Sequence, residues 1–489
     1  MRGSRMKKVI LNILHLLLNV VLAASLFVSC WCFLTPYFRV NRNTQGDAFR
    51  NLPADTVQVL AVGSSHMQYA FNPGVYYAMT GAYSYVFASV CQPFDASYWI
   101  IKEAFEHQSP KLVYIDIYTL LPQSSNCYAN EVYYIAGDML SDANRDEMLK
   151  GAVKLDETTR LMYRFDLYMN HDRWRDMDLF DLKSIEKNAQ PSKDINGELG
   201  YVRMEPTNLI YTPLAILDVT ENVELSSREK KEIDDIITLC RSNGAVPVFT
   251  CAPFLMDQDS TNKKAAVWKY LDQKGISFID EIADSENHWF LDMNGDTAHN
   301  NSWGADIVTR DYAQFALDNN IVKVSVYNAV YDGLVYQMNR TNAWSLMNET
   351  NINVYTLLDD AKYFPCTVLL RFGANRRHGL PEDEAAALNA IGFTKDFVND
   401  YRTGYYAVVQ NGQLVRESDE PFDMELNGHS LSFSEDAILL DGAAVNSNGE
   451  MQLVFGGDDL SWTNAIGIDY VSRWFWKNGC DGWNCSYAD

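Results

Sequence analysis

The sequence lacks several patterns that mark whole classes of protein. None of its nine cysteines belongs to a C-x-x-C pair, the usual spacing of a structural zinc site, so we expect no metal. No basic stripe occurs outside the first eight residues and the formal net charge is −24, which excludes a nucleic-acid-binding protein. No low-complexity tract is present. A composition of 47% hydrophobic and 21% charged residues therefore predicts a chain that folds over most of its length.

The first 34 residues predict one membrane-spanning helix. Residues 9–34 carry no formal charge, and about 20 apolar residues already span the hydrocarbon core of a bilayer. Four basic residues and no acidic residue precede this run: Arg2, Arg5, Lys7 and Lys8. The positive-inside rule leaves residues 1–8 in the cytoplasm and the chain after about Thr35 outside it. We predict a single-pass protein of the cell membrane, with an extracytoplasmic bulk and with residues 9–34 in the lipid bilayer.

Two other interpretations of the N-terminus are less favoured by its sequence. A cleaved signal peptide normally has an apolar region of only about 7–15 residues, much shorter than residues 9–34. The segment FVSC, which ends at Cys30, faintly resembles a lipoprotein cleavage box. However, the apolar WCFL that follows is unlike the start of a mature lipoprotein, so an uncleaved anchor is the prediction.

Beyond the anchor, apolar runs alternate with helical stretches and predict an α/β domain over residues 35–320. Continuous apolar runs rich in valine are typical of buried parallel strands. The runs are 57–63, 83–90, 111–118, 245–253 and 276–280. Helical stretches such as ASYWIIKEAFEHQ separate several of them, which predicts a three-layer fold with helices on both faces of a parallel sheet. The interruption at about 121–225 predicts a helical cap, and a helix over 304–318 closes the domain.

The C-terminal part of the chain predicts a second, β-rich domain. Residues 321–360 are expected to be a linker. In residues 361–489 short strand-like segments recur between N-G, D-G and G-G turns, with one helix around PEDEAAALNAIG, which predicts a sandwich-like arrangement. Cys480 and Cys485 stand five residues apart beside turn-forming residues, so the sequence is compatible with a small disulfide loop or with two free thiols.

Three residues at opposite ends of the α/β domain supply the groups of a serine nucleophile site. Ser65 follows the first strand in the segment GSSH, at the strand end where sites of parallel sheets lie. Asp296 and His299 belong to the segment DTAH before the last helix. A serine nucleophile needs a histidine to take its proton and a carboxylate to fix the histidine tautomer. Alone, such a serine is more often a helix N-cap, but the two segments in this order predict a catalytic triad.

These segments resemble those of the SGNH/GDSL hydrolases. GSSH is similar to their first block, with Ser65 at the nucleophile position, and DTAH is similar to their last block. The membrane anchor and the residues after His299 resemble an exported branch that includes alginate O-acetylation proteins and the teichoic-acid D-alanylation protein. The resemblance covers about residues 57–318. It implies a flavodoxin-like sheet, a serine esterase or acyltransferase acting on acyl (acetyl) esters of cell-surface glycans, and a membrane-bound O-acyltransferase as partner. No cofactor is implied.

The chain departs from this family at the oxyanion hole. The family's glycine would stand near Cys91, and the G-x-N-D block after the third strand is missing from YIDIYTLLPQSS. We expect the backbone N–H groups of Ser65 and Cys91 to serve instead, since a donor need not be a side chain. Three residues are candidates for binding the substrate: His66, whose alternative role is structural, Arg173, whose alternative is an ion pair, and Asn300.

The C-terminal segments also carry a resemblance. LPEDEAAALNAIGF, YRTGYYAVVQNGQLV and WTNAIGIDYVS are similar in their order to the interleukin-like EMT-inducer domain, which implies a β-sandwich that contacts carbohydrate. The alternative is that its aromatic residues fill a sandwich core. A second function for the whole chain stays open: a catalytically silent scaffold or glycan-binding protein in envelope polysaccharide assembly, which the missing oxyanion glycine would suit.

Overall fold

The computed structural model describes most of the chain. The described residues are 2–38, 45–126, 132, 135–136, 139, 142–151, 155–164, 199–204, 217–282, 296, 298–322, 327–348, 358, 361–374, 379–380, 382–445, 451–469 and 474–477. Much of the expected cap, Arg173, and the pair Cys480 and Cys485 lie outside the described residues.

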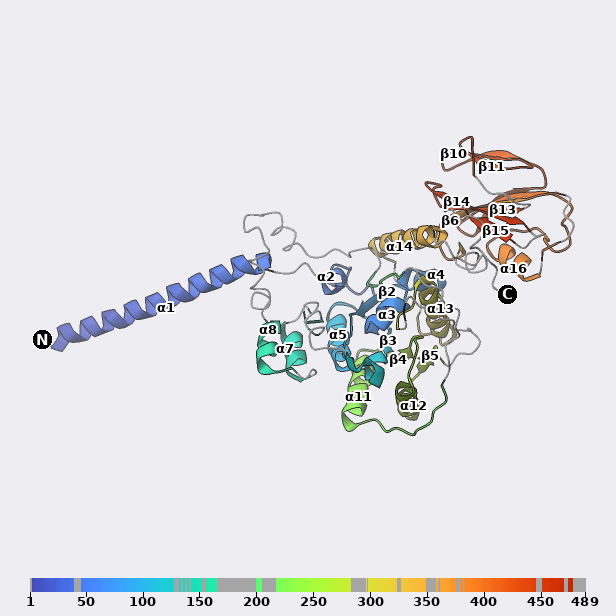
Figure 1. The fold of residues 1–489 in the computed structure, drawn as a ribbon. Helices are drawn as coiled ribbons and strands as arrows, with labels where there is room; N and C mark the ends of the chain where they lie inside the picture. The colour runs from blue at the N-terminus through green and yellow to red at the C-terminus, as the bar shows by residue number, and fades with distance from the viewer. Residues whose placement is uncertain are drawn as a thin grey trace.

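The first element is α1 (Arg2–Phe38), a single helix of 37 residues. Its stretch Lys7–Leu34 is 28 residues long and contains an 18-residue window with a mean hydropathy of 2.3. Side chains 7–30 are all exposed, and α1 stands clear of the other elements in Figure 1. Since about 20 apolar residues span a bilayer, α1 is long and apolar enough to cross a membrane, and it is the one such helix in the part of the chain that the structure describes.

Five parallel strands form the central sheet, in the order β2-β1-β3-β4-β5. They are β1 (Val59–Gly63), β2 (Ser84–Ala88), β3 (Leu112–Asp116), β4 (Val246–Cys251) and β5 (Phe278–Asp280). Each lies within one of the five apolar runs, so the predicted strands and their parallel arrangement are confirmed. The winding direction of the chain reverses between β1 and β3. At such a point the carboxyl ends of the strands are where α/β proteins place their sites.

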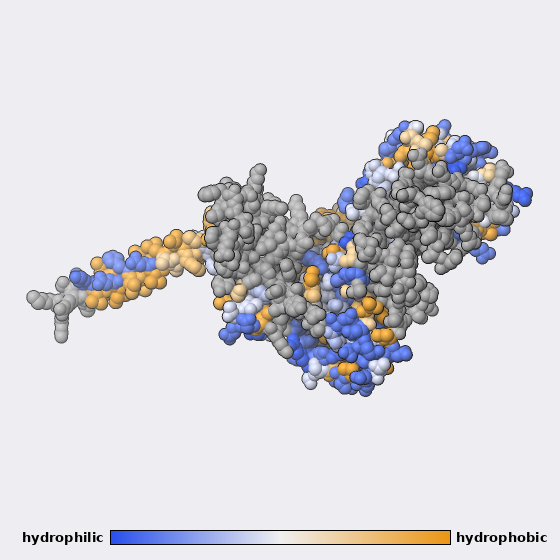
Figure 2. Space-filling view, viewed as in Figure 1, coloured by the Kyte–Doolittle hydropathy of each residue, from blue (hydrophilic) through white to orange (hydrophobic). Residues whose placement is uncertain are grey.

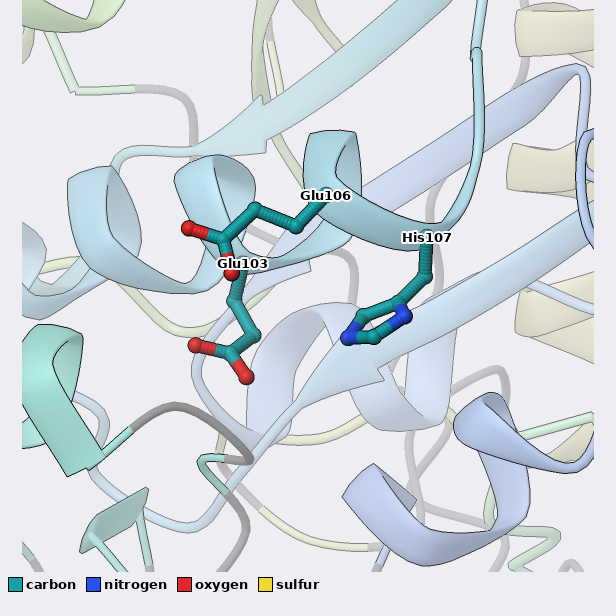
Figure 3. Close-up of side chains that lie close together, drawn as sticks. All are labelled: Glu103, Glu106 and His107. Carbon is teal, nitrogen blue, oxygen red and sulfur yellow. The ribbon is translucent and has the colours of Figure 1, made fainter.

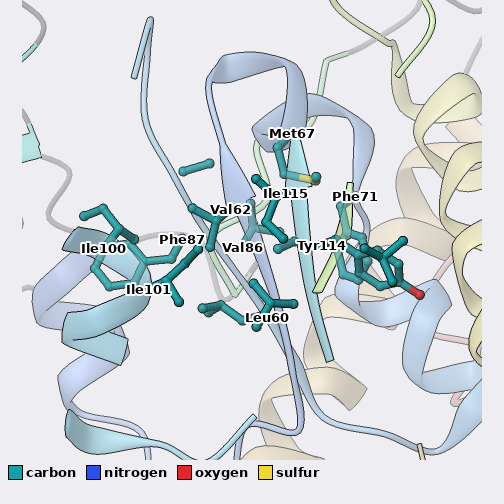
Figure 4. Close-up of a cluster of buried hydrophobic side chains, with 14 of the residues drawn as sticks. Leu60, Val62, Met67, Phe71, Val86, Phe87, Ile100, Ile101, Tyr114 and Ile115 are labelled. Atoms are coloured by element: carbon teal, nitrogen blue, oxygen red, sulfur yellow. The ribbon is translucent and has the colours of Figure 1, made fainter. Parts of the chain in front are cut away.

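Helices cover both faces of this sheet. Ile100 and Ile101 of α5 (Phe94–His107) lie on one side of the strands, and Phe71, which follows α3 (Ser65–Ala70), lies on the other (Figure 4). The remaining helices of this region are α2 (Gln45–Arg50), α4 (Pro73–Thr80), α7 (Asp142–Gly151), α8 (Glu157–Arg164), α11 (Ser227–Ser242), α12 (Gln258–Gln273) and α13 (Ser302–Asp318), with 3-10 turns at Tyr118–Leu120 and Pro122–Asn126. Because both faces are covered, β1, β2 and β3 are buried throughout and their sequences are apolar without alternation.

The segment expected to be a linker contains a helix, α14 (Ala329–Asn348). Tyr331, Val335 and Met338 of α14 are at most 2% exposed and belong to the same apolar core as the parallel sheet. Asp332 accepts hydrogen bonds of 2.8 Å from the hydroxyl groups of two further tyrosines, Tyr77 and Tyr83. The described part of this segment is therefore packed on the α/β domain.

Two antiparallel sheets make up the C-terminal region. Their elements are β6 (Cys366–Phe372), α16 (Glu382–Ala390), β7 (Tyr405–Gln410), β8 (Gln413–Ser418), β9 (Asp423–Leu426), β10 (His429–Phe433), β11 (Ile438–Leu440), β12 (Ala443–Ala444), β13 (Met451–Gly457), β14 (Thr463–Asp469) and β15 (Trp474–Lys477). One sheet has the order β15-β14-β13-β6-β7-β8 and the other β12-β11-β10-β9. The predicted β-rich character of this region is confirmed.

Alternating side chains of β6 divide the C-terminal core into two clusters. Val368 and Leu370 pack in a cluster that includes residues of α16, whereas Leu369 packs with Leu431 of the smaller sheet. Successive residues of a strand point to opposite faces, so the six-stranded sheet is covered on both sides.

The C-terminal sheets share apolar contacts with the α/β domain. Val75 of α4 and Trp303 of α13 belong to the same cluster as the side chains of β6. At the surface, Arg340 of α14 forms ion pairs with Asp459, at 2.6 Å, and with Asp458, at 3.5 Å. The two domains therefore meet through α14 and the helices beneath it (Figure 1).

These contacts predict that the domain boundary lies after α14 rather than near residue 320. A chain truncated after Asn348 should keep its α/β part folded. A chain truncated after Asn320 loses three buried side chains of α14, each contributing about 1.5–3 kcal/mol, and should be about 5 kcal/mol less stable. Urea unfolding of both chains in the same detergent, followed by tryptophan fluorescence, measures the difference. Equal unfolding midpoints would show that α14 is dispensable.

Candidate active site

Ser65 is the first residue of α3, directly after β1. Ser64 is the N-cap of this helix, with extended backbone, and its hydroxyl oxygen accepts a hydrogen bond from the N–H of His66 at 3.3 Å. The sharp change from strand to helix brings Ser65 to the carboxyl end of a strand in the interior of the sheet, where its side chain is largely buried but not sealed, at 7% exposed.

His299 reaches Ser65 from the far end of the domain. Its Nε2 lies 2.8 Å from Ser65 Oγ, across 234 residues of sequence. The backbone around His299 is held by α13, whose N-cap Asn301 accepts hydrogen bonds from the N–H groups of Trp303 and Gly304 at 3.1 and 3.0 Å. The imidazole also packs beside the ring of Tyr69, with 4.8 Å between ring centres.

Asp296 fixes the other side of the imidazole. Its Oδ2 and Oδ1 lie 2.9 and 3.1 Å from His299 Nδ1. Oδ1 also accepts the N–H groups of Ala298 and His299 itself, at 2.7 and 2.8 Å. Partial burial alone would raise the pKa of Asp296, but the hydrogen bonds from His299 and Ala298 outweigh it and hold the pKa below its usual value. An ionised carboxylate favours the tautomer with the proton on Nδ1, which leaves Nε2 free to accept the serine proton.

A buried carboxylate that the sequence analysis missed, Asp116, supports the turn before Ser65. It ends β3 next to β1, and its Oδ2 accepts a hydrogen bond from Ser64 Oγ at 3.0 Å while its Oδ1 accepts the N–H of Tyr118 at 3.1 Å. Burial raises the pKa of Asp116 to about 6, although these hydrogen bonds oppose the shift. The sequence signal for Asp116 was an acidic residue within an apolar run, the run that forms the strand next to that of the nucleophile.

Asp116 also explains why residue 63 is a glycine. A Cβ atom on Gly63 would lie 2.5 Å from the Cβ of Asp116, a non-bonded distance that Cβ atoms essentially never show. Glycine is therefore needed at position 63 because β1 and β3 approach each other closely at the site, and not because the backbone adopts an unusual angle there.

His66 is almost wholly buried beside the triad. Its ring stacks on Tyr118, with centres 3.5 Å apart, meets the ring of Phe254 edge-on at 4.9 Å, and lies 5.5 Å from the ring of His299. Burial, with a smaller contribution from His299, lowers the pKa of His66 well below its usual value. Its Nε2 has no hydrogen-bond partner among the described residues. His66 is thus a neutral imidazole with an unused polar atom next to the nucleophile.

The loop after β2 carries Cys91, the expected oxyanion donor. Gln68 of α3 holds this strand end by donating its side-chain N–H to the carbonyl of Ala88 at 2.9 Å. Cys91 has a φ of 49°, in the left-handed region that favours glycine. Among the described residues, the backbone N–H groups of Ser65 and Cys91 donate no hydrogen bond to another residue. Both expected donors are therefore available at the carboxyl edge of the sheet.

The structure says little about the substrate-binding roles predicted for Asn300 and Arg173. Asn300 is 1% exposed and already has a partner within the chain, so its predicted substrate contact stays a prediction. Arg173 lies outside the described residues. Near the site, glycine is needed at position 200 for a structural reason: its φ is 86°, and a Cβ there would lie 1.9 Å from the carbonyl oxygen of Val86 in β2.

A second cluster of potential ligands lies on α5. The side-chain atoms of Glu103, Glu106 and His107 come within 4.8 Å of one another (Figure 3). However, the amide of Asn144 in α7 donates to both carboxylates, at 2.9 Å each. These acidic groups thus tie α7 to α5, and we assign them a structural role.

Comparison with known proteins adds no family assignment: no protein-family model matches the chain, and a search of the curated proteins finds no similar sequence.

The buried Asp116 predicts a pH dependence of stability. With a pKa raised from 3.8 to about 6 in the folded protein, the carboxyl contributes most below pH 4, and about 3 kcal/mol of this contribution disappears as the pH rises through 6. Asp116→Asn cannot titrate. The free energy of unfolding of the wild type, relative to that of Asp116→Asn, should therefore fall by about this amount between pH 3 and pH 8, as measured by urea unfolding. A difference independent of pH would contradict the raised pKa.

Proposed function

We propose that the protein is a membrane-anchored, extracytoplasmic serine esterase or acyltransferase of the SGNH type, with Ser65, His299 and Asp296 as its triad. The observation that carries the proposal is the 2.8 Å contact between Ser65 Oγ and His299 Nε2, with Nδ1 of the same imidazole on Asp296. The strand order β2-β1-β3-β4-β5, which is flavodoxin-like, supports the same assignment.

The geometry suits acyl transfer through a covalent intermediate. Ser65 Oγ attacks the acyl carbon while His299 Nε2 takes the hydroxyl proton. The tetrahedral intermediate then collapses, the alcohol leaves with the proton from His299, and the acyl group remains on Ser65. Water or an acceptor hydroxyl releases the acyl group by the same steps in reverse. Asp296 keeps the imidazole oriented and stabilises its charged form.

The oxyanion hole is the step at which the sequence departs from the SGNH pattern. We propose that the backbone N–H groups of Ser65 and Cys91 stabilise the developing negative charge. Cys91 adopts the left-handed conformation that glycine favours, so the loop can keep its shape without the glycine. This favours an enzyme over the alternative, a silent scaffold or glycan-binding protein.

The substrate class rests on the resemblance to the exported SGNH branch. We propose acyl (acetyl) esters of a cell-surface glycan, with α1 inserted in the membrane and the domains outside the cytoplasm. In a transferase, a membrane-bound O-acyltransferase would supply the acyl group.

We further propose that His66 contacts the substrate, since its buried Nε2 lacks a partner among the described residues.

A serine-reactive fluorophosphonate and a small activated ester test the triad. Wild type should be labelled at Ser65, as peptide mapping shows. Ser65→Ala and His299→Ala should each lower ester turnover by roughly 10⁶-fold, and Asp296→Asn by roughly 10⁴-fold, because the three residues act as a unit.

The chain offers a matched control for the histidine variant. His429 pairs with Asp441 through a 2.8 Å contact of its Nδ1, as His299 does with Asp296, but far from Ser65 in the C-terminal sheets. His429→Ala should leave turnover unchanged. Ser64→Ala is not a neutral control for Ser65, because Ser64 caps α3 and binds Asp116. Full turnover in both Ser65→Ala and His299→Ala would contradict the triad and favour the alternative function, a catalytically silent scaffold.

His66→Phe separates a substrate contact from a structural role. Phenylalanine keeps the stacking on Tyr118 and removes a buried polar atom without a partner, which costs about 1–3 kcal/mol. We expect a stability equal to or above that of the wild type in thermal unfolding, together with a kcat/KM for ester hydrolysis that is lower by roughly 10–100-fold. A loss of stability with unchanged kcat/KM would make His66 a packing residue only.

A further inference from the structure

The apolar stretch of α1 contains polar side chains that are costly in a bilayer. They are Asn12, His15, Asn19, Ser25 and Ser29. Asn19 lies within two residues of the middle of Lys7–Leu34, and its short side chain cannot reach either surface of the membrane. Polar side chains at such depth normally face another helix, where they find hydrogen-bond partners.

These residues are not scattered around the helix. At 100° per residue, Asn12, His15 and Asn19 fall within an arc of about 60°. The same face continues with the three- and four-residue spacing of a heptad seam through Leu22, Leu26, Ser29 and Phe33. In the view of Figure 2, hydrophilic residues lie along one edge of the N-terminal half of α1, and most of the remaining visible surface of the helix is hydrophobic. Ser25 flanks this seam. The helix thus has one polar seam and a lipid-like remainder.

Nothing in the described part of the chain covers this seam. Every side chain from residue 7 to residue 30 is exposed. Another helix in the membrane would supply hydrogen-bond partners for the seam.

The chemistry of the seam matches a second copy of itself. An asparagine amide both donates and accepts hydrogen bonds, so Asn19 is complementary to Asn19 at the same depth. Two copies insert with the same orientation, since the same basic residues precede both helices, and a parallel pair brings equal residues to equal depth. Asn12 and Asn19 both occupy the position of the heptad at which asparagine sets register and oligomeric state in coiled coils.

We propose that α1 pairs in the membrane with α1 of a second copy of this chain, through a parallel seam formed by Asn12, His15 and Asn19 and extended by the heptad positions up to Phe33. The proposal rests on the membrane anchoring proposed above. The pair holds two catalytic domains on the same side of the membrane, so one polymeric substrate can engage both.

Cysteine cross-linking of the full-length protein in its membranes tests the seam. Both variants carry Cys30→Ala and Cys32→Ala. Ser29→Cys then places a thiol in the seam, whereas Val28→Cys places one on the face of the helix that points away from the seam. All other cysteines are the same in both variants. Mild oxidation should give a covalent homodimer with Ser29→Cys and much less of it with Val28→Cys.

A composition-matched variant tests the asparagines. Exchanging neighbours, with Asn12→Ile and Ile13→Asn together with Asn19→Val and Val20→Asn, moves both amides off the seam and leaves the overall hydropathy unchanged. Energy transfer between labelled chains in lipid vesicles should report a dimerisation constant weakened by roughly tenfold or more in this variant.

The outcomes separate the pairing from the anchoring. Alkaline extraction tests the anchoring, because an integral protein stays in the membrane; a chain that is extracted overturns both proposals. A chain that stays but is monomeric, cross-links equally at both positions, or pairs equally well after the exchange overturns the pairing alone. A Ser29→Cys product that contains a different protein also overturns it, in favour of a heterologous helix.

Discussion

The structure of the site depends on how α13 packs against α3 and α4. Ser65 begins α3, and His299 stands just before the N-cap of α13, so any shift between these helices separates the hydroxyl from the imidazole. Two side chains of α13 lock the connection between α3 and α4: Thr309 Oγ1 accepts the N–H of Asn72 at 2.7 Å, and Asp306 accepts its side-chain amide at 2.8 Å. Buried hydrogen bonds of this kind are costly to break, so the 2.8 Å contact at the site is held by the fold rather than by its own strength.

The sequence predicted the parallel sheet because a strand covered on both faces needs apolar residues at every position, which is a local signal. It did not predict α14. Tyr331, Val335 and Met338 share one face of that helix, but Gly333 and several polar residues interrupt the pattern, and its partners, Tyr77 and Tyr83, lie some 250 residues earlier. Likewise β8 was missed: its residues are mostly exposed, so its sequence QLVRES carries no apolar alternation. Elements whose signal comes from distant packing cannot be recognised from local pattern.

The residues of the candidate site also divide into those that a local sequence pattern predicts and those that depend on distant packing. Ser65, Asp296 and His299 lie together as their order and spacing predicted, because each belongs to a short segment with its own chemical signature. Asp116 was not predicted, since a single acid in a strand has many meanings until its neighbour Ser64 is known. Gly63 is needed for the approach of β3, whereas the residue in the glycine-like conformation is Cys91, and backbone angles of non-glycine residues leave no mark in the sequence.

Three features near Ser65 work against stability, and their clustering is itself informative. Asp116 is a buried carboxyl whose ionised form burial disfavours, His66 holds a buried nitrogen without a partner among the described residues, and Cys91 adopts a conformation that side chains rarely take. A chain selected for stability alone would replace each of them with an apolar residue or a glycine. Asp116 and His66 lie at the turn that carries Ser65, and Cys91 follows the neighbouring strand β2 at the same edge of the sheet. Unfavourable features concentrated at one point are typical of a site shaped by its chemistry, and this favours the enzyme over the silent scaffold.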